Sequence, residues 1–543
     1  MKAKQKPGIV FQPQVHRAMQ QGIYKLVSAI RPTLGPLAGG VAIDPLNVAE
    51  VLPEYLDDGG LIARRIIELQ DRDEDMGAML VRSMITRHYE RVGDGTATLA
   101  VLFEAIFNTG IRYITAGGNA MQMRRYLDEG LLLILKALDS MVVPLVGPSA
   151  LTRLAYSLCR QEDMAELMGE AFDLIGEYGR LDIREDYGRV LRREYVEGNY
   201  FHGGLFPRIM QPEESTSRAS VENAAIFLCD FEIDEHRDLF PILQMAKEAN
   251  VPALVIIARN LSEAATSLLV AHNRMNLFKV MAVKLPGLNA EDRMGALDDL
   301  SVLTGAKAFV KIAGDSWVNI HAAQLGQARR VWADKWQFGM VNPGGDPRKV
   351  RQHVQRLKTT YQSLLDLEDR KKIQERIGSL QGGSVTLWIG GFTEPEINAR
   401  KSQAQRAALT MRAAVQEGAV PGGGLALLKC KSVLETRYRR AGSVDERAAY
   451  GCLLEALEAP ARVIYQNAGY EPGEVLAQLN GKSSLSGFDV VRGRVVNMMD
   501  AGILDSLMVL KSAVRNAVST AALALTIDSL VHVAAPEMVG KPT

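Results

Sequence analysis

Several short segments of the chain carry residue types that bind phosphate and metal ions. The segment Gly93–Thr98 contains an aspartate, Asp94, between two glycines, and an apolar, helix-like pattern follows the segment at Leu99. The first turn of a helix presents unpaired N–H groups and the positive end of the helix dipole, which suits a phosphate. Asp94 offers a hard oxygen ligand for Mg²⁺. The same residues also fit a plain Asp-Gly turn with a threonine cap and no ligand.

Three further turns have a similar composition. Thr33–Pro36 predicts a tight turn after a helical segment, and Pro421–Gly424 places three glycines before another helix. Glycine lets a backbone approach a ligand closely. Leu56–Gly60 adds two carboxylates that can polarise water or coordinate a metal. The alternatives are an ordinary turn, a flexible joint and a solvated acidic turn, respectively.

The composition is that of a folded protein without charge bias. The chain has 543 residues, 47% of them hydrophobic, and its 63 basic residues balance its 63 acidic ones. A mainly disordered chain is therefore excluded, and no nucleic acid partner is expected. There is no run of about 18 apolar residues and no secretory signal in residues 1–13, so we expect a cytoplasmic protein without a membrane span. The four cysteines form no CxxC pair, which indicates reduced core thiols.

The two ends of the chain and its middle show different periodicities. Apolar residues recur at helical spacing near the ends, in Met76–Arg91, Asn119–Val142 and Val509–Leu530. Strand-like apolar runs occur in the middle, at Ala224–Ile233, Ala253–Arg259, Lys279–Leu285 and Ala306–Ile312. Helical patterns alternate with them, at Asp238–Asn250, Ser262–Met275 and Glu291–Gly305. We therefore predict a helical domain built from both ends, and βαβ units with a parallel sheet in the middle.

The middle block ends with a charged segment and is bounded by glycines. Asp346–Leu380 predicts a helical hairpin that turns near Asp366–Asp369. Gly198 precedes the block, and Gly382-Gly383 follows the hairpin. Glycine absorbs large backbone rotations, so these positions fit hinges between domains. They also fit ordinary turns.

Taken in order along the chain, these motifs resemble those of the group I, GroEL-type chaperonins. The resemblance extends from position 20 to position 530. The matching segments are Thr33–Pro36, Asp58-Gly59, Glu68–Ala78, Gly93–Thr98, Arg412–Gly424, Asn467–Gly469 and Asn497–Asp505. Two stretches of the middle block, PILQMAKEANVPALVIIA and VKLPGLNAEDRMGALDDLSVLTG, resemble the apical domain of that family.

The resemblance implies a multidomain α and α/β fold with the chaperonin architecture. It predicts a mainly helical equatorial domain that binds ATP with Mg²⁺ and K⁺, an α/β apical domain that binds non-native proteins, and a small intermediate domain. The implied boundaries are 1–143 and 417–543 for the equatorial domain, 144–197 and 385–416 for the intermediate domain, and 198–384 for the apical domain. Gly198 and Gly383 would be the hinges.

The nucleotide-site positions of the family fall on the motifs of this chain. The implied nucleotide-binding residues are Thr33, Leu34, Gly35, Pro36, Asp94, Gly95, Thr96, Ala97, Thr98, Gly423, Asp489 and Asp505. Asp94 corresponds to the magnesium ligand, and Asp505 to the aspartate that binds the ribose hydroxyls. Asp489 corresponds to a residue near the adenine. Asp58 corresponds to a catalytic carboxylate near the γ-phosphate.

Arg406 is the main departure from the family pattern. The family has a second catalytic aspartate six residues before the arginine of its RAAV segment, and counting back from Arg412 this position is Arg406. An arginine stays protonated at neutral pH and cannot act as a base, although it can pair with phosphate charge. We therefore expect ATP binding with slow or absent hydrolysis.

The client-binding positions implied by the resemblance lie in the predicted apical domain. They are Leu205, Ile209, Phe240, Leu243 and Val270. Arg208 and Thr266 stand where the family has apolar side chains. An exposed apolar patch binds unfolded chains by burying their apolar surface. The alternative for these residues is ordinary packing against their neighbours.

The resemblance also implies partners and leaves two functions open. It implies homo-oligomeric rings, seven-membered and commonly doubled, together with a GroES-type cochaperonin and non-native protein clients. One function is an ATP-driven folding chaperone, which Asp58, Asp94 and Asp505 favour. The other is a non-hydrolysing chaperonin-like protein that holds clients, alone or in mixed rings with another chaperonin, which Arg406 favours.

Overall fold

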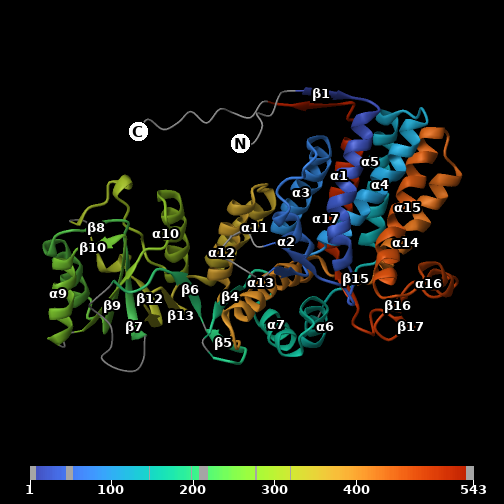
Figure 1. Cartoon of the computed structure of the whole chain (residues 1–543). Helices are drawn as coiled ribbons and strands as arrows, with labels where there is room; N and C mark the ends of the chain where they lie inside the picture. The colour runs from blue at the N-terminus through green and yellow to red at the C-terminus, as the bar shows by residue number, and fades with distance from the viewer. Residues whose placement is uncertain are drawn as a thin grey trace. The chain divides into compact units, whose positions relative to one another are not determined.

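The chain folds into two compact units (Figure 1). The computed structural model describes residues 8–533 except 45–52, 146, 187, 197, 207–217, 276–277 and 318–319. Unit 1 combines Met1–Asp173 with Asn398–Thr543, and unit 2 is Leu174–Ile397. The first unit is therefore built from both ends of the chain and the second from its middle. The finer division into equatorial, intermediate and apical parts stays a prediction.

Unit 1 is mainly helical. Its helices are α1 (Gln14–Ile30), α2 (Gly59–Arg65), α3 (Arg72–Val92), α4 (Thr96–Thr115), α5 (Ala120–Asp139), α6 (Pro148–Cys159), most of α7 (Glu162–Ile175) and of α13 (Glu394–Glu417), α14 (Leu425–Arg439), α15 (Val444–Asn467), α16 (Pro472–Leu479) and α17 (Leu507–Ala524). Two predicted helices, Met76–Arg91 and Asn119–Val142, are confirmed as α3 and α5. The predicted helix Val509–Leu530 ends earlier, at Ala524, and Leu530 belongs to a strand.

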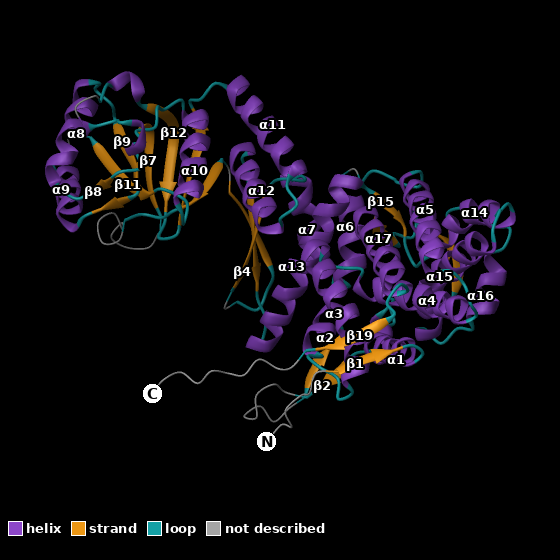
Figure 2. Ribbon diagram, turned by 90° about the horizontal axis from the view of Figure 1, so that it is seen from above, coloured by secondary structure: helices purple, strands orange, loops and turns teal. Residues whose placement is uncertain are grey.

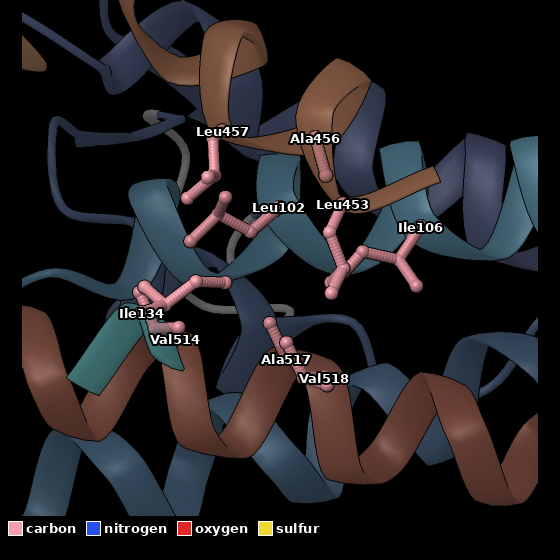
Figure 3. A pocket seen from close by; sticks show the side chains of 9 residues that line it. All are labelled: Leu102, Ile106, Ile134, Leu453, Ala456, Leu457, Val514, Ala517 and Val518. Atoms are coloured by element: carbon pink, nitrogen blue, oxygen red, sulfur yellow. The ribbon is translucent and has the colours of Figure 1, made fainter. Parts of the chain in front are cut away.

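The core of unit 1 lies where α4 packs between α15 and α17. Alanines along α17, such as Ala513, Ala517 and Ala521, are fully buried and let the helices approach closely. A small cavity of about 10 Å³ remains between α4, α5, α15 and α17 (Figure 3). All nine side chains around it are apolar and small or aliphatic: Leu102, Ile106, Ile134, Leu453, Ala456, Leu457, Val514, Ala517 and Val518. A cavity of this size has room for about one water molecule, so it is a packing defect and not a ligand site.

Short two-stranded sheets complete unit 1. The chain ends meet where β1 (Gly8–Phe11) pairs antiparallel with β19 (Ser529–His532). The others are β2 (Val41–Ile43) with β3 (Glu54–Leu56), β15 (Ala419–Pro421) with β18 (Leu504–Ser506), and β16 (Ser486–Asp489) with β17 (Arg494–Asn497). The sequence patterns did not predict these short strands.

Unit 2 contains a six-stranded sheet in the order β11-β9-β7-β12-β13-β6. These strands are β6 (Asn199–His202), β7 (Ala219–Leu228), β9 (Ala253–Ala258), β11 (Lys279–Lys284), β12 (Gly326–Ala333) and β13 (Gln337–Pro343). Only β7, β9 and β11 are parallel to one another, while β12, β13 and β6 join antiparallel. The predicted parallel sheet is therefore wrong for half of the strands, because the sequence patterns predicted neither β6, which precedes residue 224, nor β12 and β13, which follow residue 312.

Helices cover both faces of this sheet (Figure 2). Along β7, Ala225 and Phe227 face one core, with α8 (Leu239–Glu248) and α9 (Glu263–Arg274). Ala224 and Ile226 face the other core, with α10 (Ala290–Thr304), α11 (Pro347–Ser363) and α12 (Leu367–Gln381). The alternation follows from the two-residue period of a strand, and strands buried on both faces read as continuous apolar runs.

Most of the predicted elements of unit 2 are confirmed, and one is wrong. The three strands, the three alternating helices and the helical hairpin at Asp346–Leu380 are present. Ala306–Ile312 is not a strand. It forms one isolated bridge, Phe309 with Cys229, and then a 3₁₀ turn at Lys311–Ala313. The apolar residues of this segment fill the core beside the sheet without a ladder of hydrogen bonds.

A second sheet of unit 2, in the order β4-β14-β5, adjoins the two predicted hinge glycines. Its strands are β4 (Arg180–Glu185), β14 (Ser384–Ile389) and β5 (Arg192–Val196), and a small pair, β8 (Glu232–Ile233) with β10 (Asn260–Leu261), lies elsewhere in the unit. Gly198 and Gly383 have φ angles of 100° and 79°, which favour glycine. The Gly383 N–H donates to the Gly198 carbonyl at 2.9 Å. The two predicted hinge glycines thus lie next to each other, and their hinge role stays a prediction.

We expected no membrane span and reduced core cysteines, and most of the residues concerned are buried in the structure. Within the described residues, one helix, Thr96–Thr115, has the length and hydropathy of a membrane span, but 61% of its apolar window is buried as the central helix of unit 1. The four cysteines, Cys159, Cys229, Cys430 and Cys452, are free and buried. Burial raises the pKa of Cys159, Cys229 and Cys430 to about 12, which makes these thiols unreactive at neutral pH.

Candidate nucleotide-binding site

The loop Gly93–Gly95 connects two long helices and opens the second with free N–H groups. Gly93 ends α3 and Gly95 precedes α4, with φ angles of 76° and 77°. No side chain caps the start of α4, so the N–H groups of its first turn are left for a ligand. The Asp94 side chain is exposed, and its Oδ1 accepts the Gly95 N–H at 2.7 Å. The loop therefore has the geometry of an anion site beside a carboxylate.

Gly59 is the point where three of the predicted site segments meet. A Cβ atom at this position would lie 2.7 Å from Ile30 Cγ2, 3.0 Å from Thr96 Oγ1 and 3.5 Å from Thr33 Oγ1. No larger residue fits without a shift of these neighbours. The turn at Thr33, the acidic turn before Gly59 and the start of α4 are therefore packed against one another.

The turn Thr33–Pro36 is fixed through its carbonyl groups. It follows a 3₁₀ turn at Arg31–Thr33, and Gly35 has a φ of 104°. The Asn467 Nδ2 donates to the carbonyls of Arg31 and Leu34 at 3.0 and 2.8 Å. The Asn-Ala-Gly motif thus holds a turn that lies more than 430 residues away in the sequence.

Asp58 lies at the start of α2 and faces a cation. Its Oδ1 accepts the Leu61 N–H at 2.9 Å, as an N-cap, and its Oδ2 lies 3.5 Å from Arg406 Nε. Burial raises the pKa of Asp58 above its ordinary value, and the charge of Asp94 raises it further. The Arg406 guanidinium opposes this shift in pKa. Asp58 and Asp94 therefore lie near enough to repel each other in the absence of a cation between them.

Arg406 projects from α13, whose backbone packs against the α3–α4 loop. A Cβ atom on Gly93 would lie 2.8 Å from the Arg406 carbonyl oxygen. The Arg406 Nη1 donates to Ser402 Oγ at 3.2 Å, and its side chain is 19% exposed. The position that the resemblance assigns to a catalytic aspartate thus lies beside Asp58 and carries a partly buried cation.

Gly422, Gly423 and Asp505 form another part of the predicted site. In the β15–β18 pair, Val420 lies opposite Asp505, and a Cβ atom on Gly422 would lie 3.1 Å from Asp505 Oδ1. Gly423 has a φ of 63° and lies against Met498. Burial, with a smaller contribution from the charge of Asp94, raises the pKa of Asp505 to about 7. This coupling connects Asp505 electrostatically with the α3–α4 loop.

Asp489 differs from the other predicted residues because its own hairpin uses its side chain. It is buried, and its Oδ1 accepts the N–H groups of Val491 and Arg492 at 3.0 and 3.1 Å. Arg492 Nη1 lies 3.5 Å from the other oxygen. The carboxylate therefore stabilises the turn between β16 and β17, and a contact with adenine stays a prediction.

Two residues that the sequence reasoning missed lie against the site. The guanidinium of Arg160 donates to the carbonyls of Gly35 and Pro36 at 2.5 and 2.8 Å. His88 is fully buried below the α3–α4 loop, where its Nδ1 lies 3.2 Å from Ser512 Oγ, and burial lowers its pKa to about 4. Neither residue lies in a recognisable motif, and only the fold brings them to the site.

The donor set at this site fits a magnesium ion that is carried with a nucleotide. No cluster of three or more His, Cys, Asp or Glu residues that could hold a metal by itself occurs in the described part of the chain. Mg²⁺ is usually bound by one or two carboxylates together with phosphate oxygens and water. Asp94 supplies an exposed carboxylate, and Asp58 lies near enough for the charge of Asp94 to raise its pKa, so the two carboxylates meet this requirement.

The predicted client-binding residues fall into different environments. Phe240, on α8, is 50% exposed, and Val270, on α9, is half-buried. Leu243 and Leu205 are 9% and 8% exposed and belong to the two cores of unit 2. Both leucines thus pack internally, which was the alternative to a binding surface, and their role in client binding stays a prediction. Ile209 lies outside the described residues.

The comparisons with known proteins agree with this fold. The sequence matches the TCP-1/cpn60 chaperonin family over residues 26–534, and the chain belongs to this family. It is similar in structure to the chaperonin gp146 from the bacteriophage EL 2 (Pseudomonas aeruginosa), solved in two crystal forms in the presence of ATP-BeFx. The TM-scores are 0.68 and 0.62 at 18% sequence identity, with 96% and 98% of this chain and 99% of gp146 covered. The predicted family and the multidomain α and α/β fold are thus confirmed.

Proposed function

We propose that this chaperonin subunit binds Mg-ATP, assembles into rings and assists the folding of non-native proteins. One observation supports nucleotide binding most strongly. The uncapped start of α4, Asp94, Asp58 and the Thr33–Pro36 turn come together around Gly59, although they lie far apart in sequence. The fold neighbour gp146 was crystallised with an ATP analogue, which agrees with this proposal. K⁺ binding is expected only from the family.

Ring assembly is supported by two small sheets with exposed apolar residues. The pairs β1–β19 and β2–β3 each have two strands, and two-stranded sheets are marginally stable alone. Ile9, Phe11 and Val531 are 59–65% exposed on the first pair, and Tyr55 is 70% exposed on the second. Such edges add strands from another chain readily. A homo-oligomeric ring, seven-membered and doubled, is the expected assembly.

A second candidate function is a chaperonin that holds clients with little ATP turnover, alone or in mixed rings. The contact of Arg406 with Asp58 favours it, because a cation occupies the position of a predicted catalytic carboxylate. Arginine cannot take a proton from water at neutral pH. The two candidates share nucleotide binding and differ in hydrolysis. A GroES-type cochaperonin is an expected partner in either case.

Three measurements on the purified chain test these proposals. Native mass, with and without ATP and with an orthodox chaperonin added, tests assembly, and a monomer under all conditions would contradict it. Calorimetric titration with Mg-ATP tests binding. Steady-state phosphate release distinguishes the candidates, since a folding ATPase turns over continuously and a holding protein keeps its nucleotide.

A further inference from the structure

We propose that Arg160 is a positioning residue of the nucleotide site, which holds the Thr33–Pro36 turn in its binding conformation. The inference rests on the proposed nucleotide binding and adds a residue that no motif includes. Arg160 follows the last residue of α6 and has a left-handed backbone, with a φ of 54°. A non-glycine residue in this region is uncommon. This conformation places its side chain against the turn.

Arg160 and Asn467 both hold the Thr33–Pro36 turn, through hydrogen bonds to different carbonyl groups. Its Nη1 and Nη2 donate to the carbonyls of Pro36 and Gly35 at 2.8 and 2.5 Å, while Asn467 binds the carbonyls of Arg31 and Leu34. Hydrogen bonds from a charged donor are stronger than those between neutral groups. Arginine suits this role because its planar fork can reach two neighbouring oxygens at once.

Holding these carbonyls has a chemical consequence for an anionic ligand. A carbonyl that pointed into the site would repel a phosphate, whereas here both are directed to a cation. In the part of the chain that the structure describes, the Gly35 N–H has no hydrogen-bond acceptor of its own. With the Gly35 and Pro36 carbonyls held by Arg160, the Gly35 N–H remains as a donor for a ligand. The turn that contains it packs beside the uncapped start of α4. Arg160 also interacts electrostatically with Asp57 and Asp94.

A simpler role for Arg160 is that of a positive charge near a polyanion, and substitutions separate the two. Arg160→Gln should weaken Mg-ATP binding by about tenfold, since two hydrogen bonds that order the turn are lost. Arg160→Lys keeps the charge but not the planar fork, so it should recover only part of the affinity. Arg153→Gln is the control, because Arg153 is an exposed arginine of α6 whose side chain packs against Gly502.

Hydrogen exchange without nucleotide tests the positioning directly. The amides of residues 33–39 should exchange faster in Arg160→Gln than in the unmodified protein or in Arg153→Gln. Full recovery of affinity in Arg160→Lys, or unchanged exchange and affinity in Arg160→Gln, would overturn the inference. If the unmodified protein fails to bind Mg-ATP at all, the proposed function fails, whereas loss of binding in Asp94→Ala together with normal binding in Arg160→Gln would refute the role of Arg160 alone.

Discussion

The Nε atom of Arg406 lies 3.5 Å from Oδ2 of Asp58, so that a cation faces the carboxylate predicted to assist hydrolysis. Both side chains are less than 20% exposed, which strengthens their interaction relative to that of a surface pair. The positive charge favours the ionised form of Asp58 and also attracts phosphate. It cannot orient or deprotonate water as a second carboxylate would. On the proposed nucleotide binding, we therefore expect this pair to give a long-lived nucleotide complex with slow turnover.

The first prediction concerns ATP hydrolysis. The unmodified protein should bind Mg-ATP and hydrolyse it slowly, because losing one positioned acid–base group typically costs about 10²–10⁴-fold in rate. Arg406→Asp should raise the rate at least several-fold without tightening binding. Arg406→Gln is the matched control, since it removes the cation without adding a carboxylate and should not accelerate hydrolysis. Steady-state phosphate release measures all three, and rapid turnover by the unmodified protein would contradict the assignment of Arg406.

The second prediction concerns the metal. Asp94→Ala should weaken Mg-ATP binding by at least tenfold, because the phosphate charge and its Mg²⁺ lose an exposed carboxylate at the start of α4. Asp128→Ala is a suitable control, since Asp128 is exposed on α5 and lies outside the predicted site. Asp71 is not suitable, because its side chain caps α3 through Asp73 and Glu74. Titration calorimetry measures binding, and equal affinities of both variants would indicate a plain Asp-Gly turn.

The sequence predicted the long elements of the fold better than the short ones. Helices such as α3 and α5 have many periodic residues and a clear cap, so their patterns are sufficient. The strands β12 and β13 were missed, whereas the apolar run Ala306–Ile312 was predicted as a strand although it fills the core and forms only one isolated bridge. Whether an apolar segment becomes a strand depends on the edge that is open to it, which is a property of the whole sheet.

The candidate site shows the same limit. Asp94 and Gly423 could be predicted because they lie in local motifs, where the residue types of a turn or of a helix start are set by neighbouring positions in the sequence. Arg160 reaches the Thr33–Pro36 turn across 124 positions of sequence, and no local pattern indicates it. The contact between Arg406 and Asp58 likewise depends on how α13 packs. Long-range contacts of this kind require the folded chain.

The third prediction concerns client capture. Phe240 is the most exposed of the described client-binding candidates, so Phe240→Ser should reduce capture of an unfolded protein, with up to roughly 2–3 kcal/mol lost if the ring is fully buried in the complex. Leu243 is unsuitable for this test because it is a core residue, and its substitution would destabilise unit 2. Leu365→Ser, at a 96% exposed position between α11 and α12, is the control. Equal capture by both variants would show that Phe240 is not a client contact.

The last prediction uses the raised pKa of the Asp505 carboxyl group. Its pKa in the folded protein is about 7, well above that of a carboxyl group in an unfolded chain, which is about 3.9. Between these values the folded state binds the proton more tightly than the unfolded state, so the contribution of Asp505 to stability falls as pH rises from about 4 to 7. Above pH 7 the destabilisation is fully present, because the half-buried carboxylate is then ionised where desolvation disfavours its charge.

Asp505→Asn removes this ionisation while keeping the shape of the side chain. The variant should therefore unfold at a higher temperature than the unmodified protein at pH 8, by several degrees, and the difference should shrink steadily as the pH is lowered toward 5. Asp94→Ala should reduce the same difference, because the charge of Asp94 contributes to the raised pKa of Asp505. Thermal unfolding in a series of buffers measures both effects. A difference in unfolding temperature that does not change with pH would show that the ionisation of Asp505 carries no penalty in the folded site.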